Sequence, residues 1–499
     1  MNSTAIIAII LGYFALLVIV ALLTSRKANN TTFFTGERKS PWFVVSFGMI
    51  GASLSGVTFI SVPGWVGNAA NQFSYMQAVL GYTIGYLIVA FVLLPIYYRM
   101  NLTSIYEYLK ERFGVWSYKT GASFFLVSRV IGASVRLLLV ANVLQAILFD
   151  EMGVPFEFTV VISVLLIWLY TNRGGIKTIV WTDTLQTAFM MISVCLTVWF
   201  VFNGLENPTD KGVIETVSTS GFSKIFFFDD LNSSNHFLKH FLGGIFITLG
   251  MTGLDQDMMQ KNLTCKSVGD AQKNMVSLGV ILVFVNLLFL GLGALLYIYA
   301  QQQGIDYGKS DLLFSSVALS DYAGPAIGLF FLLGLIAAAY SSADSALTSL
   351  TTSFSVDFLN VKDKTDNKES TRKIVHIFMS AILILVVLLL KRTTDESAIG
   401  LLMKFAGFTY GPLIGVFFFG ILSRRNVKDG YVPIISIISI LLTFIMWYFS
   451  AGAPGGEPGN GLFGAYQFGF ELIIVNSLIT FVLMFVASTI KKGVYEDPA

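Results

Sequence analysis

Residues 337–347 carry the polar groups whose spacing points most directly to chemistry, inside an apolar run long enough to span a bilayer. At about 100° per residue, five of them lie on or beside one stripe of a helix: Ala338, Ser341, Ser342, Asp344 and Ser345. An intramembrane carboxylate costs at least ~2.5–3.5 kcal/mol and marks an ion or substrate path. Hydroxyl and carboxylate oxygens suit a hard cation, so we predict that this stretch binds Na⁺. The alternative is that the serines bond to backbone carbonyls and pack against a neighbouring helix.

The composition places this stretch in a membrane protein. Of the 499 residues, 55% are hydrophobic and 12% are charged, and the mean hydropathy is +0.73. Apolar segments recur at membrane-span length, which predicts one polytopic integral membrane protein. A net charge of +2 argues against a nucleic-acid partner, and two cysteines and three scattered histidines predict neither a disulfide framework nor a transition-metal site. The sequence holds no phosphate-binding glycine loop and no Ser/His/Asp set, so we do not expect an enzyme.

The apolar segments predict an all-α protein with thirteen membrane spans. They cover residues 4–24, 42–67, 72–97, 118–149, 155–172, 177–204, 236–258, 271–302, 325–356, 372–391, 397–422, 430–449 and 468–489. Lysines and arginines concentrate in alternate loops, one of which contains Lys261, Lys266 and Lys273. By the positive-inside rule these loops are cytoplasmic. The N-terminus is therefore expected outside and the C-terminus inside.

Two spans carry interruptions five spans apart. Residues 51–58 place two glycines and three hydroxyl residues at mid-membrane, and residues 249–257 are again punctuated by glycine and polar groups. Such residues weaken a helix, and free carbonyls in a membrane are tolerated only where they line a cavity or hold an ion. The pattern is typical of an inverted-repeat transporter, although close packing at glycines is the alternative. The repeats would be residues 42–204 and 236–422, with 4–24 and 430–489 peripheral.

Three ionisable residues elsewhere in the spans are further candidates. Arg129 and Arg136 are seven residues apart and share a helix face; we expect Arg129 to reach the cytoplasmic interface and Arg136 to be a functional cation or half of a structural ion pair. Asp183 opens its span, where it either favours the helix start or binds an ion.

Four motifs together resemble the sodium/solute symporter family, which includes sodium/glucose, sodium/proline and sodium/sialic acid cotransporters. They occupy residues 174–186, 255–263, 337–347 and 407–415 and span most of the chain. The resemblance implies a LeuT-like inverted repeat of five plus five helices that works by alternating access. The whole chain, residues 1–499, would then be a single transporter domain.

The resemblance also implies two cation sites. The general sodium site would use backbone carbonyls at the first interruption and the small-Ser-Ser pattern, at Gly51, Leu54, Ala338, Ser341 and Ser342. An additional sodium site in some members corresponds to Asp183, Ser341, Asp344 and Ser345. Asp344 replaces a serine of the sialic acid transporters. Two nearby carboxylates repel, so either a cation lies between them or one binds a proton.

Substrate contacts are carried over by position to Ser55, Thr58, Gln77, Arg136 and Asp255. We therefore expect a Na⁺-coupled symporter, functional as a monomer in the plasma (cell inner) membrane, that imports a small polar organic solute such as a sugar or a sialic acid-like sugar acid. Three alternatives remain open at this point: a proton-coupled symporter of the same fold, a solute sensor without transport, and an ion channel.

Overall fold

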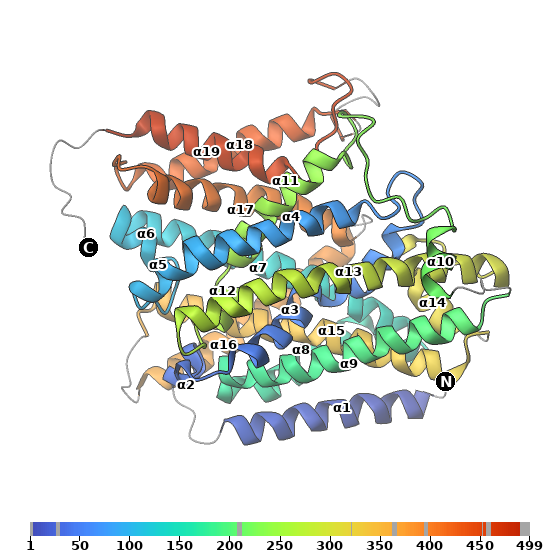
Figure 1. Cartoon of the computed structure of the whole chain (residues 1–499). Coiled ribbons are helices and arrows are strands. Elements are labelled where there is room, and N and C mark those ends of the chain that lie inside the picture. The colour runs from blue at the N-terminus through green and yellow to red at the C-terminus, as the bar shows by residue number, and fades with distance from the viewer. Residues whose placement is uncertain are drawn as a thin grey trace.

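The computed structural model describes residues 3–25, 30–206, 212–320, 322–361, 367–393, 398–451, 453–455 and 461–489. Within these ranges the regular structure is entirely helical, apart from three isolated bridges. The long helices run side by side along one axis (Figure 1). α1 begins at one end of this bundle and α19 ends at the other (Figure 1).

Each predicted span falls on a helix, but the count of thirteen full-length crossings is not reached. In the described ranges ten helices are long and apolar enough to cross a membrane, and a sharply bent pair makes eleven. The apolar helices at Phe156–Asn172 and Leu472–Ala487 are shorter than the others. The helices concerned are α1 (Ser3–Thr24), α3 (Trp42–Trp65), α4 (Tyr75–Ile88), α5 (Leu94–Arg99), α7 (Val115–Leu144), α8 (Phe156–Gly174), α9 (Ile176–Asn203), α11 (Phe237–Thr248), α12 (Gln256–Asn262), α13 (Val268–Gln303), α15 (Gly324–Ser353), α16 (Asn367–Thr393), α17 (Ala398–Leu422), α18 (Tyr431–Tyr448) and α19 (Leu472–Ala487).

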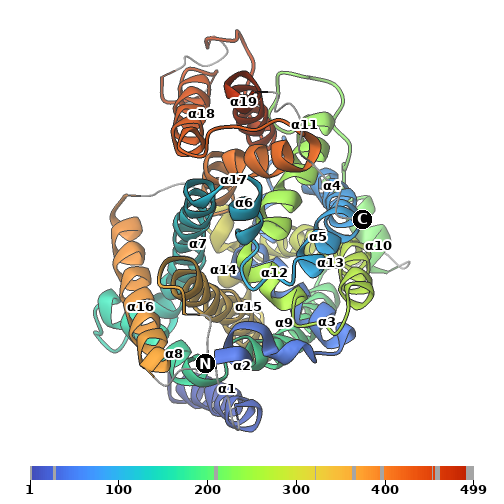
Figure 2. The same ribbon diagram turned by 90° about the vertical axis from the view of Figure 1, so that its left-hand side faces the viewer.

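Burial separates a central group of helices from a peripheral one. The most apolar windows of α3 and α15 are 83% and 78% buried, whereas those of α1 and α18 are 22% and 28% buried. In the end-on view α15 lies inside the bundle while α1, α16 and α18 lie on its rim (Figure 2). α15 packs along α3, α7 and α9. The polar stripe of α15 therefore faces protein rather than lipid.

Both predicted interruptions are confirmed. In α3 the backbone at Ser55 has φ 49° and ψ 170°, a conformation that non-glycine residues rarely adopt and that breaks the helical path. The other interruption separates α11, extended by the π-helical turn Leu249–Gly253, from α12, which is bent away by 69°. Interrupted helices of this kind expose backbone groups at membrane depth, where a ligand can use them.

Candidate functional site

The first part of the site is a buried carboxylate held between α9 and α15. Asp183 on α9 accepts hydrogen bonds from Ser341 Oγ at 2.9 Å and from Ser345 Oγ at 3.3 Å. All three side chains are buried. α3 also approaches α9 closely here because it presents a glycine: a Cβ on Gly48 would lie 3.1 Å from Asp183 Cβ. The structure therefore brings together three of the four residues assigned to the additional cation site.

A lysine that the sequence analysis placed in a cytoplasmic loop completes this cluster. Lys261 belongs to α12 and is only 1% exposed, and its Nζ lies 2.8 Å from Asp183 Oδ2. The loop assignment was wrong because α12 continues inside the protein after the 69° bend. The motif at residues 255–263 could have indicated this buried position, because Asp257 and Lys261 are four residues apart and thus lie on one side of a helix. A buried charge of this kind needs a partner.

Asp344, the fourth residue assigned to the additional site, lies beside this ion pair. Tyr170 Oη on α8 donates to Asp344 Oδ2 at 2.7 Å, while Asp344 Oδ1 is buried without a hydrogen-bond partner. Asp344 also interacts electrostatically with Asp183 and Lys261. The cluster thus contains two carboxylates and one ammonium group within the membrane-spanning core.

The residues assigned to the general sodium site lie at the neighbouring contact between α3 and α15. Ser342 Oγ is fully buried and has no hydrogen-bond partner in the described chain. α3 comes so close that a Cβ on Gly56 would lie 3.3 Å from Ala339 Cα. Gly51 and Leu54 precede the break at Ser55, and carbonyls on that side of a helix break lose regular helical partners. Gly51 N–H is itself bound to Thr187 Oγ1 at 3.1 Å. A free hydroxyl beside a broken helix can bind a small hard cation, with Ala338 and Ser341 completing the set.

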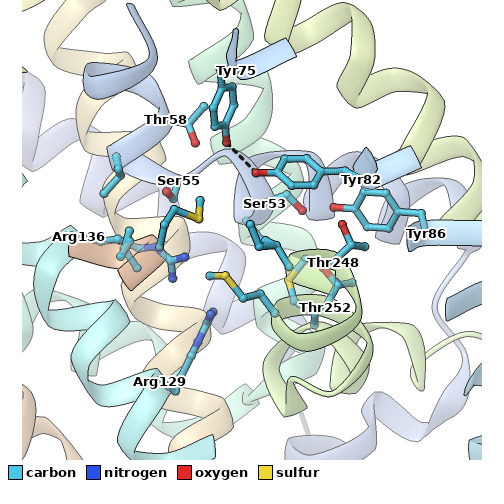
Figure 3. A pocket seen from close by; sticks show the side chains of 17 residues that line it. Ser53, Ser55, Thr58, Tyr75, Tyr82, Tyr86, Arg129, Arg136, Thr248 and Thr252 are labelled. Carbon is cyan, nitrogen blue, oxygen red and sulfur yellow. Dashed lines mark hydrogen bonds between the residues drawn. The ribbon is translucent and has the colours of Figure 1, made fainter. Parts of the chain in front are cut away.

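The second part of the site is a central cavity of about 100 Å³ between α3, α4, α7, α11 and α17. Figure 3 shows its polar lining, which comes from hydroxyl groups and two guanidinium groups. These residues are Ser53, Ser55, Thr58, Tyr75, Tyr82, Tyr86, Arg129, Arg136, Thr248 and Thr252. Ile247, Met251, Met258, Leu402 and Met403 contribute apolar surface. A cavity with this mixture suits a small polar solute that also has an apolar face.

The two arginines of the cavity differ in what they bind. Arg129 forms a close ion pair with Asp257 on α12, and its Nη1 lies 3.8 Å from Asp255 Oδ2. The expectation that Arg129 reaches the cytoplasmic interface was therefore wrong. Arg136 is 6% exposed, and within the described residues it has neither an ion pair nor a hydrogen bond. Arg136 is thus a buried cation that lines the cavity; Asp255 and Tyr410 interact with it electrostatically, but its Nε makes no hydrogen bond within the described residues.

Two of the five residues assigned to the substrate lie outside the cavity lining. Gln77 Nε2 donates to Asn235 O at 3.0 Å, and its Oε1 accepts from Phe227 N at 3.0 Å. Asp255 caps α12 by accepting from the backbone N–H groups of Asp257 and Met258, and Tyr410 Oη donates to it. The structure therefore gathers Ser55, Thr58 and Arg136 in the cavity, whereas the Gln77 and Asp255 side chains already bind protein groups.

Comparison with known proteins identifies the family of this chain. The sodium:solute symporter family matches residues 33–433. The sodium/sialic acid symporter SiaT of Proteus mirabilis is 25% identical over 458 residues, covering 87% of this chain and 88% of its own. Sodium-coupled monocarboxylate transporter 2 of Homo sapiens is 28% identical over 281 residues, covering 53% of this chain and 43% of its own. A solved structure of a Na⁺-coupled sialic acid symporter in a substrate-bound, outward-open state superposes with a TM-score of 0.81 at 20% identity, covering 96% of this chain and 97% of that one.

The family match covers most of the chain, and the family consists of transporters. Among the described residues no group of three or more His, Cys, Asp or Glu side chains could hold a metal ion. The chain belongs to the sodium:solute symporter family, and it is a multi-pass membrane transporter that uses Na⁺ as its coupling ion.

Proposed function

We propose that this transporter imports a small organic anion of the sugar-acid class, whose carboxylate binds Arg136. The observation that carries the proposal is the guanidinium group of Arg136, which is 6% exposed, lines the central cavity and forms no ion pair within the described residues, while its Nε is buried without a hydrogen-bond partner there. A buried charge without a partner is costly, and a planar carboxylate is the group that a guanidinium binds best. A neutral sugar would leave this cost in place.

The rest of the cavity supports a hydroxylated solute. Ser55 and Thr58 come from the broken helix α3, and Tyr75 and Tyr82 from α4, where Tyr82 Oη donates to Tyr75 Oη at 3.3 Å. These groups both donate and accept hydrogen bonds, as sugar hydroxyls require. The similarity to sialic acid symporters supports the same class of solute.

The proposed general sodium site contains Gly51, Leu54, Ala338, Ser341 and Ser342, at the contact between α3 and α15. Ser55, which breaks α3, also lines the cavity, so the ion site and the solute site share one helix break. Na⁺ that orders this break raises the affinity for solute, and solute raises the affinity for Na⁺ by the same factor. The two interrupted helices support an inverted repeat of residues 42–204 and 236–422. The basic loops support import across a plasma membrane, with the N-terminus outside.

A short monocarboxylate is a second candidate, favoured by the size of the cavity. Its volume of about 100 Å³ is smaller than the roughly 300–1,000 Å³ of a typical ligand pocket. A sugar acid requires the cavity to widen, whereas a short carboxylate does not. The partial similarity to a monocarboxylate transporter points the same way.

Ligand-dependent thermal stabilisation of the purified protein tests the proposal. The panel contains sugar acids, their uncharged methyl esters, neutral sugars and short monocarboxylates, each in Na⁺ and in K⁺. We expect an acid to stabilise the protein in Na⁺ only, and its ester to fail. Arg136→Met should weaken binding of the acid at least about 30-fold, because removing one member of a buried charge pair costs at least ~2 kcal/mol. Equal binding of acid and ester, or no loss in the variant, would refute the role of Arg136.

A further inference from the structure

The additional cation site contains a cation that belongs to the protein. Asp183, Ser341 and Ser345 gather at one point, and the Lys261 ammonium group lies there, 2.8 Å from Asp183 Oδ2. Lys261 is 1% exposed, and the second carboxylate of the cluster, Asp344, interacts with it electrostatically. An ammonium group and Na⁺ carry the same charge and interact with the same oxygens.

The net charge of the cluster becomes zero when one Na⁺ binds. A cation bound beside Asp183 and Asp344 favours the ionised form of both carboxylates, so that they contribute two negative charges and Lys261 contributes one positive charge. Among the described residues, the hydroxyl groups that donate to the two carboxylates come from Ser341, Ser345 and Tyr170, and all three are neutral. One Na⁺ at the neighbouring Ser342 site makes the whole group neutral. A second Na⁺ would leave an excess positive charge in a low-dielectric core, which is unfavourable.

We propose that Lys261 is a tethered cation that replaces a second Na⁺, so that this chain binds and couples one Na⁺ per solute. The proposal rests on the proposed function, because it takes Ser342 as the Na⁺ site. It assigns a role to Lys261 that a purely structural ion pair would not have. A structural pair stabilises the fold, whereas a tethered cation sets the number of ions bound.

The test counts Na⁺ bound to the purified full-length protein, using ²²Na⁺ at equilibrium and pH 8.5, where protons compete least for carboxylates. We expect one Na⁺ per chain for the wild type. Lys261→Met leaves Asp183 and Asp344 without the ammonium group, so we expect two Na⁺ per chain. Asp183→Asn combined with Lys261→Met removes one of the two carboxylates again, so the count should return to one. Lys261→Arg keeps the charge and is the matched control, with an expected count of one.

Each outcome separates the two proposals. Two Na⁺ bound to the wild type, or one bound to a monodisperse Lys261→Met variant, would overturn the role of Lys261 and leave the proposed function standing. No Na⁺ bound to the wild type would overturn the proposed general sodium site. Lys261→Gln, which keeps a polar group next to Asp183, provides the same count if the methionine variant is not monodisperse.

A transport measurement gives an independent readout in proteoliposomes. One Na⁺ moving with one monovalent organic anion transfers no net charge, so wild-type uptake should not respond to an imposed membrane potential. Lys261→Met, with two Na⁺, should transfer one positive charge per cycle and be stimulated by an inside-negative potential. The ratio of ²²Na⁺ flux to solute flux distinguishes this result from uptake of a neutral solute.

Discussion

The substitution Ser342→Ala separates ion binding from fold stability. Ser342 Oγ is fully buried and makes no hydrogen bond in the described chain. Removing it therefore breaks no protein–protein hydrogen bond, and the change in the free energy of unfolding without Na⁺ should stay within about 0.5–1 kcal/mol. A hydroxyl that ligates Na⁺ is a different case, because interactions with a charged group contribute about 1.5–3 kcal/mol.

This free-energy contribution sets the expected shift in the Na⁺ concentration for half-maximal binding. Since about 1.4 kcal/mol corresponds to a factor of ten, the Na⁺ concentration for half-maximal binding should rise about 10- to 100-fold in the variant. The assay is a Na⁺ titration of thermal stabilisation at constant ionic strength, with choline replacing Na⁺. Uptake of solute at the same Na⁺ concentrations should shift in parallel, because the Na⁺ and solute affinities are linked.

Ser349→Ala is the matched control on the same helix. Ser349 is equally buried, but its Oγ donates to Ala346 O at 3.0 Å. We expect this variant to lose about 1 kcal/mol of stability and to keep the wild-type Na⁺ midpoint. The reasoning fails if the Na⁺ midpoint of Ser342→Ala is unchanged, or if the two variants shift it equally.

Two further predictions concern the contacts of α12 and the loop that follows it. Arg129→Met should reduce the free energy of unfolding by about 3–5 kcal/mol, because it leaves Asp257 as a buried unpaired charge. Adding Asp257→Asn should restore most of this loss. Thermal midpoints measured without solute check both expectations, and no recovery in the double variant would contradict the pairing. Cys265 is fully buried, and burial raises the pKa of its thiol to about 12. In a Cys195→Ser background, its reaction with N-ethylmaleimide at pH 7.5 should therefore be at least about 100-fold slower than in the denatured protein. Comparable rates would show that this thiol is accessible.

The helices and their interruptions could be predicted because they depend on local composition. Apolar length identifies a span whatever packs around it, and most predicted boundaries fall within a few residues of the observed helices. The glycine and hydroxyl clusters likewise weaken a helix locally, so the break at Ser55 lies inside the predicted stretch. The helix α19 shows the limit: the predicted span covers residues 468–489 but the helix covers only Leu472–Ala487, because composition indicates an apolar segment without giving the number of its residues that are helical.

The partners of the charged residues could not be predicted, because they depend on the angle at which helices cross. Counting positive charges between spans placed Lys261 in a loop, but a 69° bend returns α12 to the core and puts this lysine against Asp183. In the same way Arg129 meets Asp257, whereas Arg136, the other guanidinium group of the cavity lining, forms no ion pair with a described residue. The sequence listed these charges correctly, and the packing decided which of them are already paired.

α12 connects the two parts of the site through its own side chains. Asp257 pairs with Arg129, which lines the solute cavity, and four residues later Lys261 pairs with Asp183 in the ion cluster. The two residues are separated by about 6 Å along one rigid helix, so a displacement of α12 changes both ion pairs together. We expect a solute anion bound at Arg136 to act on Arg129 as well, since both guanidinium groups line the same cavity, and a change in the Arg129–Asp257 pair would be transmitted along α12 to Lys261. Charge in the cavity is thereby linked to charge at the ion site, which gives a physical route for the reciprocal coupling that symport requires.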